Sequence, residues 1–324
     1  MPHPPQRTRK PTGRQHYVSA GYLARFTLQG ERDSPFFVHS LVDGQVRQGT
    51  PNSVAFERHY HTIDVPHLAP NHLESIFQKI ESPACALFKT LSESPGRDLS
   101  EADKDTMLMF FAMQAARVPQ SRRKYDALML DCARAFMNEV AHSPGFYDRV
   151  MAIATKYGIE TGSGDQARLR EAVDGGHIYP VLAPTQSAIG IFRLTEAILD
   201  AVDGMNYGLW YSDSAAFICS DYPVGLFYSL SAEDPLADPM PVIAMRKTPI
   251  FMPLAHNVAL VIHTLKDGPT VQLVPERIVG VVNACTVGYA QRFICSPLQD
   301  FVCVLPNRQV GNAKQTVEAI MSFA

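Results

Sequence analysis

The sequence lacks most of the short motifs by which enzymes and metalloproteins are recognised. It has no glycine-rich phosphate loop, no dinucleotide-binding fingerprint, no kinase signature and no Gly-x-Ser-x-Gly elbow. Its eleven histidines are not spaced with cysteines or acids as zinc ligands would be, and its aspartates show no calcium-loop spacing. Function therefore has to be inferred from polar residues that occur in apolar segments.

Cysteine is sparse, and long apolar runs are absent. The six cysteines are scattered without a Cys-x-x-Cys pair, which predicts buried small hydrophobic residues in a reducing compartment. No apolar h-region follows the N-terminus, and no apolar run is long enough to span a membrane. We therefore expect a cytoplasmic protein without a membrane partner. The net charge of −3 gives no general reason to expect a polyanionic partner.

What is present is the composition of a globular protein. Hydrophobic residues make up 46% and charged residues 19% of 324 residues, enough to form a core without disulfide bonds or metals. Residues 1–15 differ, because they contain four prolines and four basic residues but no acid. This composition predicts a flexible basic tail, which is either simply solvated or able to touch phosphates.

The segments after the tail predict a hairpin followed by helices. Residues 35–41 are β-like, and Asp43-Gly44 is a turn that leads into residues 45–48. Asn71 and Glu74 have the spacing of a capping box, and Pro83 is expected to kink or restart the helix that they begin. Further helices are predicted from a second box at residues 100–103 and from apolar periodicity. These helices span about residues 100–119, 121–141, 144–157 and 186–202.

The C-terminal third changes to short strands. β-branched and aromatic runs are separated by proline, glycine and aspartate, which is typical of strands. They lie at residues 207–211, 216–219, 225–228, 258–263, 270–274 and 301–305, with one helix at about 276–292. Strands at both ends and helices between them predict an α+β fold with a mixed or antiparallel sheet. We expect one domain over residues 16–324, in which residues 71–202 form a helical layer.

Residues 107–118 form the most informative segment. They are apolar almost all round, which predicts a buried helix whose only polar side chains are Gln114 and Arg117, one turn apart. A buried arginine needs a carboxylate or a bound anion. Either Glu81 or Asp221 pairs with Arg117 inside the fold, or Arg117 grips a phosphate or carboxylate of a ligand, and both can hold at once.

Three other polar residues stand beside apolar segments. Glu81 lies at the edge of the apolar stripe of its helix, where it is a boundary residue, a partner for Arg117, a general base or a metal ligand. Ser220 and Asp221 follow an apolar strand, where either local turn chemistry or a functional site accounts for them. Asn283 lies within an apolar helix and is interpreted as a satisfied core amide.

Several of these segments form an ordered set of motifs. The set is Gln15-His-Tyr-Val-Ser-Ala-Gly-Tyr-Leu-Ala-Arg-Phe26, Phe56-Glu-Arg-His-Tyr60, Leu73-Glu-Ser-Ile-Phe-Gln-Lys-Ile-Glu-Ser82, Phe111-Ala-Met-Gln-Ala-Ala-Arg-Val-Pro119, Phe217-Ile-Cys-Ser-Asp-Tyr-Pro223 and Phe251-Met-Pro-Leu254. Their order resembles the bacterial family called Domain of Unknown Function 4238. Gln15 and Ser19 stand where that family often has histidine and proline. The resemblance implies that His16, Glu81, Gln114, Arg117 and Asp221 belong to recurring motifs, and it implies no activity.

Two classes of function fit these residues. The first is a hydrolase acting on a phosphate ester, such as a nucleic acid or nucleotide, with His16, Glu81 and Asp221 as catalytic residues. In that hypothesis Gln114, Arg117 and Ser220 bind the substrate, and Glu81 and Asp221 hold a divalent cation or orient the base. The second is a non-enzymatic module that binds a protein or an acidic small ligand and whose buried polar network only specifies the fold. The sequence determines neither the metal nor the oligomeric state.

Overall fold

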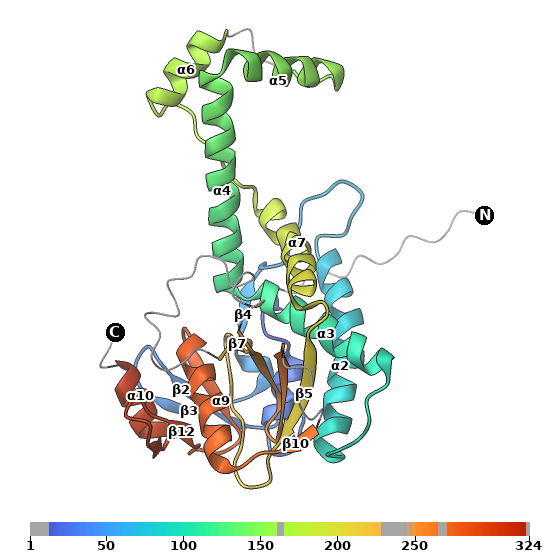
Figure 1. Ribbon diagram of the computed structural model, residues 1–324, viewed down its shortest axis with the longest axis vertical. Coiled ribbons are helices and arrows are strands. Elements are labelled where there is room, and N and C mark those ends of the chain that lie inside the picture. Colours follow the sequence, from blue (N-terminus) through green and yellow to red (C-terminus); the bar gives the residue numbers. More distant parts are fainter. Residues whose placement is uncertain (1–12, 161–164, 228–244, 246–247, 265–270, 322–324) are drawn as a thin grey trace, which may run out of the picture.

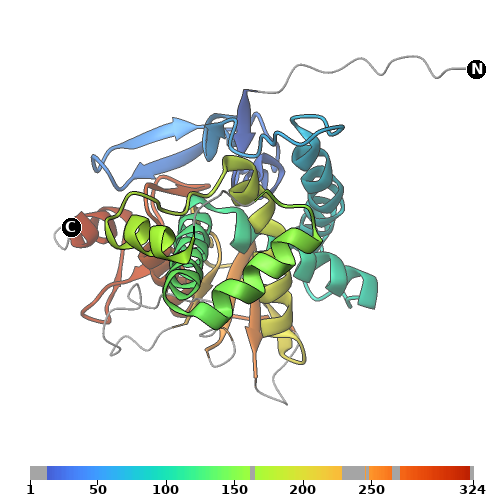
Figure 2. The ribbon, with the colours of Figure 1, turned by 90° about the horizontal axis from the view of Figure 1, so that it is seen from above.

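The structure is a computed structural model that describes residues 13–160, 165–227, 245, 248–264 and 271–321. Figure 1 shows a rounded body of strands and helices from which one long helix, α4, rises with α5 and α6 at its far end. Figure 2 gives the same chain from above, with the tip helices in front of the body.

The N-terminal elements are short. They are β1 (Arg14–His16), α1 (Ala20–Leu23), η1 (Ala24–Phe26), β2 (Phe36–Ser40), β3 (Val46–Gly49), η2 (Pro51–Ser53) and β4 (Phe56–Arg58). The predicted hairpin is confirmed, because β2 pairs with β3 and Gly44 takes a positive φ of 68° in the turn. Arg14 and Gln15 were expected in the tail, yet both belong to β1, which pairs with β4, and Gln15 is fully buried. Residues 1–12 lie outside the described residues.

Helices fill the middle of the chain. They are α2 (His72–Glu93), α3 (Glu101–Arg117), α4 (Pro119–His142), α5 (Pro144–Lys156), α6 (Gln166–Asp174) and α7 (Pro184–Val202). The Ser100 box is present, because the Ser100 hydroxyl accepts from the Asp103 amide and the Asp103 carboxylate accepts from the Ser100 amide. Helix α6 was not predicted. In the described part of the chain, no helix combines the length and apolarity needed to cross a membrane.

Two details of α2 differ from the prediction. Asn71 occupies the N-cap position, but its side chain makes no capping hydrogen bond. Pro83 neither ends nor restarts the helix, which continues to Glu93. Pro83 faces solvent, where water can satisfy the carbonyl freed by the missing amide, while the buried Phe77 and Leu87 anchor the helix on either side.

The C-terminal elements complete the sheets. They are β5 (Asn206–Tyr211), β6 (Cys219–Ser220), β7 (Gly225–Leu226), β8 (Ile250–Ala255), β9 (Val258–His263), β10 (Val271–Leu273), α9 (Glu276–Tyr289), β11 (Phe293–Ser296), β12 (Cys303–Val304), β13 (Val310–Gly311) and α10 (Ala313–Met321). One sheet has the order β10-β5-β9-β8-β7, and a second has the order β3-β2-β11-β6. Among the strands that the structure describes, only β10 and β5 pair in parallel. The second sheet joins N-terminal to C-terminal strands, which confirms the α+β prediction.

The main core lies between the helices and the five-stranded sheet. Helix α3 contacts both α2 and α7, and α2 also contacts β8. Residues 107–118 are almost entirely buried, as their sequence predicts. The hydroxyl of buried Tyr22 donates to the carbonyl of Pro253 in β8, at 2.5 Å. The core thus ties α1 to a strand more than 200 residues away and fixes the N-terminal segment against α3.

Candidate functional site

The candidate site is built where the segment after β1 meets helices α2 and α3. Tyr17 and Ser19 are buried there. The Tyr17 carbonyl accepts from Gln114 Nε2 at 2.8 Å and from Arg117 Nε at 3.0 Å. The Ser19 amide donates to Gln114 Oε1 at 3.4 Å. One turn of α3 therefore satisfies the backbone of a non-helical segment, which accounts for polar residues in an otherwise apolar helix.

Arg117 is sealed by these contacts. Its side chain is 1% exposed, and its Nη1 meets Glu81 Oε1 at 2.5 Å. Its Nη2 donates to Gln114 Oε1 at 3.0 Å, and the guanidinium lies 5.5 Å from the centre of the Phe77 ring. The other Glu81 oxygen accepts from the Ser19 hydroxyl at 2.7 Å. Glu81 is therefore the partner of Arg117, and every nitrogen of the guanidinium has an acceptor.

Two histidines lie beside this ion pair. Burial, and secondarily the Arg117 charge, lower the pKa of His16. The same causes hold the pKa of the more deeply buried His61 well below its usual range. His61 Nε2 lies 3.4 Å from the His16 carbonyl oxygen, whereas His16 Nε2 is buried with no partner among the described residues. Neutral His16 thus has a ring nitrogen available to a ligand or water.

Glu74 is a second carboxyl group on the same side of α2. It precedes Glu81 by seven residues, close to two helical turns. Burial raises the pKa of Glu74 to about 7, although the Arg117 charge lowers it, and the Glu81 charge contributes to the rise. Glu74 Oε1 is buried and has no partner among the described residues. Glu74 can therefore hold and release a proton near neutral pH.

Asp221 and Ser220 have different partners. The Asp221 carboxylate accepts from the backbone amides of Gln291 and Arg292, at 2.9 and 3.0 Å. Burial raises the pKa of Asp221, and these amide bonds oppose that rise. The Ser220 hydroxyl donates to the Tyr222 carbonyl and accepts from the Tyr222 amide. Both side chains therefore fix the backbone beside β11, and Asp221 is not the partner of Arg117.

The structure gives the carboxylates of Glu81 and Asp221 separate partners. Glu81 is bound to Arg117 and Ser19, and Asp221 is bound to backbone amides. No group of three or more His, Cys, Asp or Glu side chains suited to a metal occurs among the residues that the structure describes. Asn283 is a satisfied core amide, as expected, because it bonds the backbone of residues 216, 218 and 302.

A basic pocket of about 380 Å³ opens next to the network. Its lining residues come from the loop after β4 and from the starts of α4 and α7. They are Glu57, Arg58, His59, Tyr60, Pro119, Arg122, Arg123, Asp126 and Ser187. Tyr60 belongs to both sites, because it lines the pocket while its hydroxyl donates to the Arg117 carbonyl at 3.1 Å.

The polar groups of the pocket are arranged in an ordered way. Arg122 donates to Ser187 Oγ at 2.6 Å and to the carbonyls of Tyr60 and Pro184, and its guanidinium lies 4.6 Å from the centre of the Tyr60 ring. Ser187 donates to Asp126 Oδ2 at 2.6 Å. Asp126 Oδ1 is buried and has no partner among the described residues. The pocket is thus lined by a guanidinium held in place, that of Arg122, and by Asp126, whose Oδ1 has no hydrogen-bond donor among the described residues.

The sequence indicated part of this arrangement. It selected His16, Glu81, Gln114 and Arg117, which the structure brings together, and Asp221 and Ser220, which it places at a turn. It missed Glu74 and the pocket arginines. The seven-residue spacing between Glu74 and Glu81 could have indicated that both carboxyl groups lie on one face of α2. Arg122 and Arg123 lie at the polar start of a helix, after a proline, and no sequence pattern there indicates a pocket.

Comparison with known proteins places the chain in a family. No curated protein and no solved structure matches it. The family model described as "Protein of unknown function (DUF4238)" matches residues 14–298, which include the polar network and every residue lining the basic pocket. The chain therefore belongs to the DUF4238 family of proteins of unknown function.

Proposed function

We propose that this protein binds a small anionic ligand, of the phosphate-bearing class, in the basic pocket. The observation that carries the proposal is the set of three arginines at residues 58, 122 and 123 around a 380 Å³ cavity that also contains two carboxylates. Arg58 and Arg123 are exposed, while Arg122 is held in place by its three acceptors. Arginine binds phosphate well because its planar donors match the phosphate oxygens.

The pocket also favours a ligand with hydroxyl or amino donors. Asp126 Oδ1 needs a hydrogen-bond donor, and a bare phosphate at neutral pH is mainly an acceptor. The Tyr60 ring adds an apolar surface to the same lining. A nucleotide or a sugar phosphate supplies an anionic group and hydroxyl donors together, so these compounds fit better than inorganic phosphate.

Arg117 has a supporting role in this proposal. The Arg117 side chain is 1% exposed and its Nη1 is paired with Glu81, so binding a phosphate would require breaking that buried pair. Its carbonyl instead receives the Tyr60 hydroxyl and so holds one wall of the pocket. The network thereby positions the pocket without contacting the ligand.

The test is calorimetric titration of the full chain with AMP, ribose 5-phosphate and inorganic phosphate. We expect binding of the first two, and a loss of at least about tenfold in affinity for the double variant Arg58→Ala/Arg123→Ala, since each charged hydrogen bond contributes roughly 1.5–3 kcal/mol. Arg193→Ala is the matched control, because Arg193 is a mostly exposed arginine outside the pocket lining. Equal affinities in the wild type and both variants would refute the proposed pocket.

Hydrolysis of a phosphate ester is the second candidate. It is favoured by the free Nε2 of neutral His16 and by Glu74, whose pKa is raised to about 7. In this mechanism the His16 imidazole takes a proton from a water whose oxygen forms a new bond to phosphorus, the P–O bond to the leaving group breaks, and protonated Glu74 gives its proton to the leaving oxygen. His16 and Glu74 do not line the basic pocket, so the substrate would have to reach them in the network beside Arg117.

The two candidates are separated by assaying turnover. Release of p-nitrophenol from bis(p-nitrophenyl) phosphate that is lost in both His16→Asn and Glu74→Gln would establish the hydrolase. Ligand binding without turnover in the wild type would leave the binding function alone. Gln299→Ala, outside the pocket lining and the network, serves as the control for nonspecific loss of activity.

A further inference from the structure

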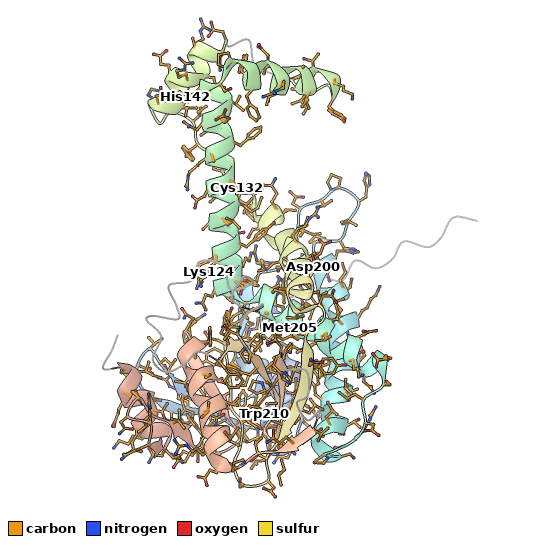
Figure 3. All side chains as sticks on the ribbon, in the orientation of Figure 1. Lys124, Cys132, His142, Asp200, Met205 and Trp210 are labelled. Atoms are coloured by element: carbon orange, nitrogen blue, oxygen red, sulfur yellow. The ribbon has the colours of Figure 1, made fainter. Side chains whose placement is uncertain are left out.

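The arm formed by α4, α5 and α6 carries an apolar stripe on α4 that is largely exposed. Figure 3 shows Cys132 midway along α4, between Lys124 near the body and His142 at the tip. Residues 127–129, 131, 132 and 134–136 are all exposed. A solvated helix of a monomer is expected to be polar on its outer side, yet here Leu128 is 38% exposed and Phe136 is 53% exposed.

The exposed apolar residues share one face of α4. At 100° per residue, Leu128, Cys132 and Phe136 follow one another at spacings of four residues, and Met129 and Ala135 flank them. Leu130, Ala133, Met137 and Val140 lie on a different face and are half-buried or buried. The second face packs within the arm, because α4 contacts α6 and Val140 accepts a hydrogen bond from Gln166. On the first face, Phe136 contacts Phe146 of α5, while Leu128, Met129 and Cys132 stay exposed.

Helix α5 extends this surface at the tip. Phe146 contacts Phe136 edge-on, with ring centroids 5.6 Å apart. Phe146, Val150, Ile153 and Tyr157 recur at helical spacing, and Ile153 and Tyr157 are exposed. A continuous apolar surface that runs from the helix to its tip is the kind of patch that marks an interaction site.

We infer that the exposed face of α4 binds the same face of a second copy of this chain, antiparallel, about a twofold axis near Cys132. In that arrangement Leu128 of each copy contacts Phe136 of the other, so the twofold axis generates this apolar contact twice. Charge favours the antiparallel direction. Lys124 and Glu139 both border the stripe at spacings of three or four residues, and Glu139 of one copy comes level with Tyr125, next to Lys124, of the other.

The antiparallel direction has two further consequences. The helix dipoles oppose, so the positive N-terminus of one α4 lies beside the negative C-terminus of the other. Helix α4 has 24 residues and is about 36 Å long, so pairing along its length brings each tip to the body of the other copy. The exposed Ile153 and Tyr157 would then be covered as well. A parallel pair would instead place the two basic starts together.

The test measures mass by sedimentation and light scattering on the full chain. Wild type is expected at twice 35.8 kDa, and Leu128→Asp at 35.8 kDa. Ala127→Asp is the matched control, since it adds the same charge at the next exposed position, away from the stripe, and it is expected to remain dimeric. Far-ultraviolet circular dichroism compares the folding of the two variants.

Cross-linking locates the axis. Cys132 is the one exposed cysteine of the six, so a short bis-maleimide is expected to join two wild-type chains and not Cys132→Ser chains. A wild type that is monomeric at all concentrations would overturn the inference. So would a dimer that survives Leu128→Asp, or one that cross-links equally well without Cys132.

Discussion

Replacing Arg117 tests the central network most directly. Arg117→Met keeps an unbranched apolar chain but removes the charge and three donors, to Glu81, Gln114 and the Tyr17 carbonyl. Because Arg117 is 1% exposed, water cannot replace these donors from its side. Breaking a buried pair by removing one partner costs about 3–5 kcal/mol in free energy of unfolding.

The comparison with a double variant separates the ion pair from the rest of the network. In Arg117→Met/Glu81→Met no uncompensated carboxylate remains, so part of the lost stability is expected to return. The Tyr17 carbonyl and Gln114 Oε1 each lose one of two donors, and the Ser19 hydroxyl loses its acceptor Glu81. At about 0.5–1.5 kcal/mol for each lost hydrogen bond, recovery should be incomplete. Glu81 is 18% exposed, which reduces the penalty for leaving it alone.

The assay is urea unfolding followed by circular dichroism and by the fluorescence of Trp210, the single tryptophan. Coincident transitions by the two probes would allow a two-state comparison. A loss below about 1 kcal/mol in Arg117→Met would refute the conclusion that Arg117 is sealed and structurally required. A double variant less stable than Arg117→Met would show that Glu81 stabilises the fold without Arg117.

Three further predictions concern substitutions of single residues. Glu74 has a folded pKa of about 7, raised from 4.5, so its contribution to stability is fully present below pH 4.5 and is lost as the pH rises through 7. Between pH 5 and pH 8 the free energy of unfolding, measured with urea, should therefore fall less in Glu74→Gln than in wild type. Equal falls in the two proteins would contradict the assignment. Asp221→Ala leaves the amides of Gln291 and Arg292 unsatisfied and should cost about 1–3 kcal/mol in unfolding free energy while AMP affinity stays unchanged, whereas a selective loss of affinity would place Asp221 in the site. Gly225→Ala should lower the unfolding free energy by about 1–3 kcal/mol because a Cβ there would lie 2.3 Å from Phe251, whereas Gly288→Ala, in open space on α9, should not destabilise, and the reverse order in urea unfolding would refute the packing described for β7.

The sequence predicted the elements whose signals are local. The hairpin at residues 36–49, the Ser100 cap and the periodic helices α4, α5 and α7 depend on neighbours within a few residues, and all are present. Some strands of two or three residues, such as β4 and β13, were missed because they are too short to show a period. Strand β8 was missed because Pro253 interrupts its pattern; the strand accommodates the proline at an irregularity in its pairing with β9.

The candidate site was predictable as a list of residues but not as an arrangement. The apolar surroundings of Arg117 showed that it needed a partner, yet the choice between Glu81 and Asp221 depends on how α2 and β6 are placed in the fold. The structure puts Glu81 next to Arg117 and puts Asp221 at the backbone of residues 291 and 292. The pocket depends on three segments that are distant in sequence, and no spacing within any one of them indicates it.

The proposed ligand pocket and the proposed dimer interface both include residues of α4. Arg122 and Asp126 line the pocket on the first turns of α4, and the stripe begins at Leu128, only two residues later. Antiparallel pairing would bring the tip of a second copy close to the pocket, since each tip reaches the level where the other α4 begins. If both proposals hold, dimerisation changes access to the pocket, and Leu128→Asp should alter AMP affinity without removing any pocket residue. An unchanged affinity in a monomeric Leu128→Asp would show that the pocket and the dimer interface act independently.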